Sequence, residues 1–180
     1  GFPNSYGTLG YAVAVAARLV AVKPFVALTH LPFENAVDCI AELARHCDDP
    51  TLDFLDGTVF APDEMYLTQG RLVDAAPMTS DYTYERIYYR SIRERRDDWL
   101  ATRDFLWRWD TDWFWCSKNV GAQRPLVRWM LGRARLNSVT YQRIMRWNSR
   151  WGVTRALDRL RGVHPESVIQ DVDIPIDRAA

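Results

Sequence analysis

The stretch FVALTHLPFENAVDCIAELARHC, residues 25–47, decides the fold because its hydrophobic pattern changes period partway along. Apolar residues alternate along residues 25–33, which predicts a β-strand. Residues 34–47 instead carry apolar side chains at helical spacing, which predicts an amphipathic helix. The predicted apolar stripe of this helix consists of Val37, Ile40, Ala41, Ala44 and Cys47. A strand followed at once by a helix indicates a helix packed on a sheet.

A β-hairpin is predicted directly after this unit. Residues 52–60 and 64–72 are strand-like runs, and the linker Ala-Pro-Asp at 61–63 is typical of a turn. The Val- and Ala-rich residues 11–22 predict a further strand, with a helix as the alternative. Together these elements predict an α+β fold with a helix on an antiparallel sheet.

The second half of the chain is rich in tryptophan and arginine. Residues 97–118 predict one long helix that is aromatic nearly all round, which is typical of a helix buried on all sides or lining a cavity. A short extended piece is predicted at 87–91 and a strand at 167–176, where the pattern alternates. Basic helical pieces are predicted near 125–132 and 137–161.

Charge, cysteine content and hydrophobic run length argue against a nucleic-acid-binding protein, a metal site and a membrane-spanning protein. Lys plus Arg and Asp plus Glu both number 23, so the formal net charge is zero, whereas a nucleic-acid-binding protein normally carries a basic excess. The three cysteines and three histidines lack the spacing of metal ligands, so we expect no metal site. No signal-peptide pattern and no run long enough to span a bilayer are present, and we therefore expect a cytoplasmic protein.

Three features could carry chemistry, and each has a structural alternative. GTLG at residues 7–10 is a weak sign of a phosphate-binding loop, and a simple turn is the commoner explanation. Tyr88 and Tyr89 fit a strand with one ring on each face, or a proton donor. Arg108 could form an ion pair with Asp104 or with Asp112, four residues away in a helix, or belong to a site.

Short motifs along the chain resemble one enzyme family. NSYGTLG at residues 4–10 resembles the last stretch of the FAD-binding domain in flavoproteins of the vanillyl-alcohol-oxidase type, which have the PCMH fold. Further patches in the same order resemble the Δ24-sterol reductase family within that group. These patches are KPFVAL at 23–28, DFLDGTVFAPDEMYLTQG at 53–70, the pair Tyr88-Tyr89, Arg103 and Arg108 with Phe114-Trp115, and VIQDVDIPI at 168–176.

The resemblance implies a division of the chain into two parts. Residues 1–32 would be the C-terminal end of an FAD-binding domain, whose main portion would lie upstream. Residues 33–180 would be a truncated substrate (cap) domain with an antiparallel sheet covered by helices. The chain would then be a C-terminal fragment, and we expect it to be inactive and to bind FAD weakly by itself.

The resemblance also implies a reaction and a site. The reaction would be reduction of a carbon–carbon double bond in a sterol-like or other bulky apolar substrate, with FAD as cofactor and NADPH as a candidate electron donor. Tyr88 or Tyr89 would donate the proton, and Arg108 would orient it. The residues against the flavin would be Ser5, Tyr6, Gly7, Thr8, Leu9 and Gly10. The substrate pocket would be formed by Trp107, Trp109, Trp113, Trp115, Gln170 and Asp171, although the last two also fit simple sheet residues.

Two alternatives from other classes stay open. A flavin-dependent alcohol, sugar or hydroxy-acid oxidase would need a polar pocket instead of an aromatic one. A non-catalytic module would use the aromatic, Arg-rich residues 103–161 to contact a partner helix or a membrane surface, which would make the protein membrane-associated. The sequence pattern predicts no oligomeric state.

Overall fold

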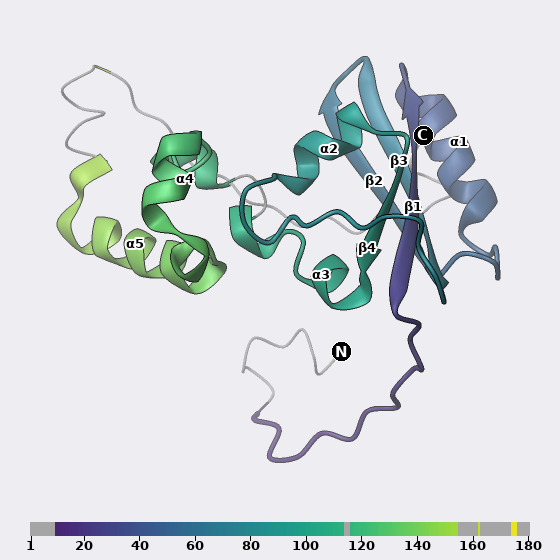
Figure 1. Cartoon of the computed structure of the whole chain (residues 1–180), viewed down its shortest axis with the longest axis horizontal. Helices are drawn as coiled ribbons and strands as arrows, with labels where there is room; N and C mark the ends of the chain where they lie inside the picture. Colours follow the sequence, from purple (N-terminus) through teal and green to yellow (C-terminus); the bar gives the residue numbers. More distant parts are fainter. Residues whose placement is uncertain (1–9, 114–115, 155–161, 163–173, 176–180) are drawn as a thin grey trace.

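The computed structural model describes residues 10–113, 116–154, 162 and 174–175, and its centre is a four-stranded antiparallel sheet (Figure 1). The strand order is β2-β3-β1-β4. The strands are β1 (Phe25–Phe33), β2 (Phe54–Ala61), β3 (Glu64–Val73) and β4 (Asp97–Ala101). The α+β class and the hairpin formed by β2 and β3 are therefore confirmed, whereas a PCMH-type domain stays a prediction.

Helices cover both faces of the sheet. Helix α1 (Ala36–His46) lies on one face, and the segment that contains α2 (Tyr88–Glu94) and α3 (Thr102–Leu106) lies on the other (Figure 1). The remaining helices are α4 (Pro125–Leu131) and α5 (Ser138–Trp151), with short 3-10 turns η2 (Asp110–Asp112), η3 (Cys116–Val120) and η4 (Arg133–Arg135) between α3 and α5. Figure 1 places α4 and α5 at the end of the molecule away from the sheet.

Strand β1 follows the predicted alternation. Val26, Leu28 and His30 are almost completely buried, while the residues between them are only half-buried. The strand pairs with β3 on one side and β4 on the other. The domain boundary expected between residues 32 and 33 thus lies at the end of a central strand of the sheet.

Helix α1 begins two residues later than predicted, and its face toward the sheet differs from the predicted stripe. Asn35 caps its first turn by accepting a hydrogen bond from the backbone N–H of Asp38 at 2.9 Å. Cys39 is the buried residue of this helix, and Val37 of the predicted stripe is 63% exposed. Ile40 of the predicted stripe and Leu43 outside it are half-buried, whereas Ala41 and Ala44 are exposed.

Three sequence predictions of secondary structure are wrong. Residues 11–22 form no strand, because no other described strand pairs with them, and their side chains are exposed. Residues 88–91 belong to α2, in which Tyr88, Ser91 and Ile92 are buried at helical spacing, and Ile87 is the N-cap of this helix. The predicted helix at 97–118 is broken into β4, α3 and two 3-10 turns.

The break within 97–118 has two visible causes. Asp98 and Leu100 are buried with a period of two, so the first residues complete the sheet as β4. Trp113 adopts a left-handed conformation with φ 42°, which ends any helical path at that point. Helices α4 and α5 confirm the two basic helical pieces, although α5 ends at Trp151. The strand predicted at 167–176 falls outside the described residues except for 174 and 175.

Candidate functional site

A row of polar side chains crosses the sheet face that α2 covers. In the strand register, Thr68 of β3 lies directly opposite both Asp56 of β2 and His30 of β1. The His30 Nδ1 atom lies 2.8 Å from Thr68 Oγ1, a hydrogen bond inside the core. Polar residues are unusual on a sheet face whose other positions include Val26, Leu28 and Leu100.

Arg108 and Tyr88 complete this cluster from the covering layer. The Arg108 guanidinium carbon lies 3.8 Å from the ring centroid of Phe105 and 5.1 Å from that of Tyr88. Arg108 Nη1 donates a hydrogen bond to the Phe105 carbonyl at 2.8 Å. A cation between aromatic faces is stabilised by their negative quadrupole. Arg108 thus lies close to Tyr88, one of the two tyrosines named as proton donor, and the catalytic role of both residues stays a prediction.

The ion pair predicted for Arg108 is wrong. Its Nη2 atom lies 3.7 Å from Asp56 Oδ2, across the sheet, instead of near Asp104 or Asp112. The predicted pairs required a continuous helix through residue 108, and the chain turns there instead. Asp56 thereby becomes the carboxylate of the cluster, a role that no sequence spacing indicated.

Several buried polar atoms of the cluster have no hydrogen-bond partner. Among the described residues, four buried side-chain atoms lack one: His30 Nε2, Tyr88 Oη, Arg108 Nε and Asp112 Oδ2. The first three belong to the cluster on the sheet. Most buried polar atoms are paired, and each unpaired one costs roughly 1–3 kcal/mol. A concentration of such atoms in one place marks a candidate site.

Burial sets the protonation states of the cluster. It lowers the pKa of His30 to about 4, so the imidazole is neutral at neutral pH. It raises the pKa of Tyr88 to about 12, against the opposing effect of the Arg108 charge. It also raises the pKa of Asp56, and Arg108 again acts in the opposite direction. The cluster thus holds a neutral phenol and a neutral imidazole beside one fixed cation.

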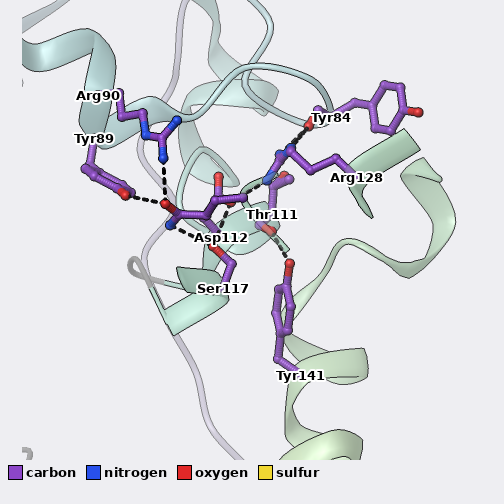
Figure 2. A network of polar contacts seen from close by, with 9 residues as sticks. Tyr84, Tyr89, Arg90, Thr111, Asp112, Ser117, Arg128 and Tyr141 are labelled. Carbon is purple, nitrogen blue, oxygen red and sulfur yellow. Dashed lines mark hydrogen bonds and ion pairs between the residues drawn. The ribbon is translucent and has the colours of Figure 1, made fainter. Parts of the chain in front are cut away.

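The Tyr89 side chain belongs to a second polar network (Figure 2). Its hydroxyl donates to Gln123 Oε1 at 2.7 Å, and Arg90 Nη2 donates to the same oxygen at 2.8 Å. Gln123 Nε2 in turn donates to Ser117 Oγ. The two tyrosines, which the sequence analysis named as alternatives, therefore have different surroundings. Tyr88 lies beside Arg108, whereas Tyr89 binds Gln123.

A buried ion pair lies at the centre of the second network. Arg128 Nη1 donates to Asp112 Oδ1 at 2.6 Å, and both side chains are at least 96% buried. Arg128 also donates to the carbonyl of Tyr84, and Ser117 Oγ donates to Asp112 Oδ1 (Figure 2). The sequence did not predict this pair. The two residues are far apart along the chain, and no regular spacing in a helix or strand relates them.

The tryptophans do not form one wall. Trp109 packs edge-on against Tyr88, with ring centroids 5.0 Å apart. Trp113 stacks on Tyr141 in the second network, at 6.3 Å, and Trp107 is 60% exposed. The described tryptophans therefore do not share one wall in this structure, and their role in substrate binding stays a prediction. The other predicted site residues, namely Trp115, Gln170, Asp171 and Ser5, Tyr6, Gly7, Thr8 and Leu9, lie outside the described residues.

The cavity found beside α2 is polar instead of aromatic-walled. Its volume is about 520 Å³, and it lies between α2, the segment ahead of it and α4. The charged side chains that line it are Arg86, Arg90, Arg95, Arg128, Glu85 and Glu94. The rings of Tyr82 and Trp129 also face it, and Tyr82 contacts Tyr88 with centroids 5.5 Å apart. The cavity thus adjoins the cluster through one aromatic ring.

Comparison of the chain with family models, with curated proteins and with solved structures gave no match. Within residues 10–113 and 116–154, no helix has the length and apolar character needed to cross a bilayer. In the same part of the chain, no three His, Cys, Asp or Glu side chains are grouped so as to hold a metal ion.

Proposed function

We propose that this chain is the substrate-side part of an FAD-dependent oxidoreductase that reduces a carbon–carbon double bond in a bulky apolar substrate. The proposal begins from the ordered motifs that resemble the Δ24-sterol reductase family. The observation that carries it is the contact between Arg108 and Tyr88, one of the two tyrosines that the resemblance implies as proton donor. Their unpaired buried atoms support a role beyond stability.

Gly10, the described end of the proposed flavin-binding motif, leaves room beside its backbone. Gly10 has φ +127°, a conformation that favours glycine, and no atom lies within 4 Å of the place where a Cβ would sit. Such a residue allows the backbone to approach a flat ring closely. The rest of the motif, Ser5 to Leu9, would hold FAD with Gly10. Bound FAD in its reduced form supplies the hydride.

The exposed apolar segment ahead of β1 also supports the proposal. Tyr11, Val13, Val15, Leu19 and Val20 are each at least 82% exposed. Monomeric proteins rarely leave so much apolar surface in water, and such surface marks a contact. In the proposed enzyme this segment is part of the FAD-binding domain and packs against the rest of that domain, which would lie upstream.

Each residue of the cluster has a stated task in the proposed reaction. Tyr88 holds at its Oη the proton that is delivered to one carbon of the double bond, while the hydride is delivered to the other. The Arg108 cation stabilises the phenolate that remains after transfer. The neutral His30 adds no charge that would repel the guanidinium. Tyr88 is only 1% exposed, so contact with substrate requires movement of some of the side chains packed around it, which include Trp109 and Tyr82.

A second candidate function is oxidation of a hydroxy acid or another polar substrate by the same cofactor. The observation that favours it is the polar cavity, because Arg90 and Arg95 on its wall suit a carboxylate. An oxidase takes electrons from its own substrate and needs no nicotinamide donor. The two candidates therefore differ in what reduces the flavin.

The test uses the flavin-loaded protein that contains this chain. It is mixed with NADPH without oxygen, and the flavin absorbance is followed. Rapid bleaching is expected for the reductase. An unchanged spectrum with NADPH and bleaching by a hydroxy acid would replace it with the oxidase. Protein that carries no flavin after purification and takes up none from solution would contradict both.

A further inference from the structure

Positive charge is concentrated in one part of the chain. Residues 124–154 contain seven arginines and no Asp, Glu or Lys. Because the whole chain is formally neutral, the remaining residues carry an equal excess of acidic groups. Arg128 and Arg133 are neutralised by ion pairs with Asp112 and Asp81, and the other five arginines create a local positive field that the net charge conceals. The segment comprises α4 and α5, so the field belongs to the end of the molecule away from the sheet (Figure 1).

The same two helices expose large apolar side chains. On α4, Leu126, Trp129 and Met130 follow one another at helical spacing, and Trp129 is 72% exposed. On α5, Ile144, Trp147 and Trp151 are exposed at the same kind of spacing. Side chains three and four residues apart share a helix face. Each helix therefore presents an apolar stripe that no described part of the chain covers.

The arginines of α5 form a second stripe beside the apolar one. Arg143, Arg146 and Arg150 each precede one of Ile144, Trp147 and Trp151, so the two rows run in parallel along the helix. All three arginines are exposed, and no acidic side chain faces them within α5. A basic row next to a tryptophan-containing row is the pattern of a helix that lies in the plane of a membrane surface.

The helices are held in place from their other side. Tyr141 is the buried residue of α5, and its hydroxyl donates to the Thr111 carbonyl at 2.9 Å (Figure 2). Arg128 is the buried residue of α4 and forms the ion pair with Asp112. Fixed helices with free outer faces form a preorganised surface, which binds a partner at a lower entropic cost.

We infer that the exposed faces of α4 and α5 dock on the surface of an anionic lipid bilayer. The positive field matches acidic headgroups, and each arginine near such a surface contributes favourably. The exposed tryptophans match the headgroup boundary, where aromatic rings with a polar N–H accumulate. A nucleic acid would use the arginines but would leave Leu126 and Met130 without a contact, so the lipid surface accounts for more of the face.

The test measures binding of the full chain to vesicles by flotation and by tryptophan fluorescence. Vesicles of phosphatidylcholine are compared with vesicles that contain roughly one-third phosphatidylserine. We expect binding to the anionic vesicles with a blue shift of the fluorescence, and weaker binding in about 0.5 M NaCl, where surface charges are screened. Arg146→Glu with Arg150→Glu should weaken binding by roughly tenfold or more, and Trp147→Ala with Trp151→Ala should remove the blue shift.

The matched control is Arg103→Glu with Trp107→Ala, which changes one exposed arginine and one exposed tryptophan in the sheet half. This variant should bind vesicles like the wild type. Circular dichroism verifies that all variants are folded. Failure to bind anionic vesicles, or equal binding by the α5 variants, would overturn the inference. Binding to single-stranded RNA or self-association in place of vesicle binding would assign the surface to a different partner and overturn it as well.

Discussion

The sheet half and the helical half of this molecule are stabilised in opposite ways. Around β1, the side chains of Val26, Leu28 and Leu100 are removed from water, and a few unpaired polar atoms are buried among them. Around α4 and α5, few apolar side chains are buried, and the ion pair of Arg128 and Asp112 connects the elements. The apolar core can hold reactive polar groups, whereas the helical half leaves its apolar groups free to contact a partner.

Arg128→Ala should have the largest effect on stability. It leaves Asp112 buried without its cation, a change that costs about 3–5 kcal/mol of unfolding free energy. Urea denaturation measures this loss. Arg133→Ala is the matched control, because Arg133 pairs with Asp81 at the surface and such pairs contribute about 0–1 kcal/mol. Equal losses for both variants would contradict the central role of the buried pair.

Leu28→Ala should destabilise the sheet half by a comparable or slightly smaller amount. Leu28 is 1% exposed, and truncation of a buried leucine costs about 2–5 kcal/mol. Leu126→Ala on α4 removes the same atoms from an exposed site and should change the unfolding free energy by less than about 0.5 kcal/mol. Urea denaturation measures both losses. Equal losses of unfolding free energy in Leu28→Ala and Leu126→Ala would contradict the difference between the two halves.

His30 should make stability depend on pH. Its pKa of about 4 in the folded state lies below the ordinary value of 6.5, so the unfolded chain binds a proton first as pH falls. The stabilisation is therefore complete above pH 6.5 and is lost toward pH 4, by about 2–3 kcal/mol. Urea denaturation of His30→Leu across this range should show a correspondingly smaller pH dependence. An unchanged dependence would mean that His30 is not buried in its neutral form.

Asn137→Ala should have the smallest effect. The Asn137 side chain accepts a hydrogen bond from the Thr140 backbone N–H at 3.0 Å and caps α5. Loss of such a cap costs about 1 kcal/mol. Asn35→Ala removes the equivalent cap of α1 and provides the comparison. Each of the two helices has one fully buried residue, Tyr141 in α5 and Cys39 in α1, so we expect the amide hydrogens of the first turn to exchange faster in each variant, by a similar factor. First-turn exchange that stays at the wild-type rate in Asn137→Ala would contradict the role of the cap.

The sequence predicted those elements whose pattern is local. The alternation of residues 25–33 and the spacing of residues 34–47 depend on the chain's own periodicity, and both elements formed. The hairpin followed from turn-forming residues between two runs. The segment 97–118 failed because Asp98 and Leu100 complete a sheet that residues far away in sequence create. Tertiary pairing overrides local propensity at such a place.

The candidate site was predictable only in part. Tyr88 and Arg108 were named from the family resemblance, and the fold brings them together. His30 and Asp56 were not predicted as site residues. The strand register that places both opposite Thr68 exists only in the assembled sheet. Their clearest sequence signal is a polar residue at a position that alternation assigns to the buried face.

The rate at which an apolar alkene reoxidises the reduced flavin tests the central claim most directly. We would measure it in the flavin-loaded protein for the wild type, Tyr88→Phe and Tyr89→Phe, after reduction by NADPH. The account predicts that Tyr88→Phe slows this step by about 100-fold or more while flavin reduction stays unchanged, because only the proton donor is lost. Tyr89→Phe should keep nearly the full rate. A wild-type rate in Tyr88→Phe would show that the buried cluster on the sheet is not the catalytic site.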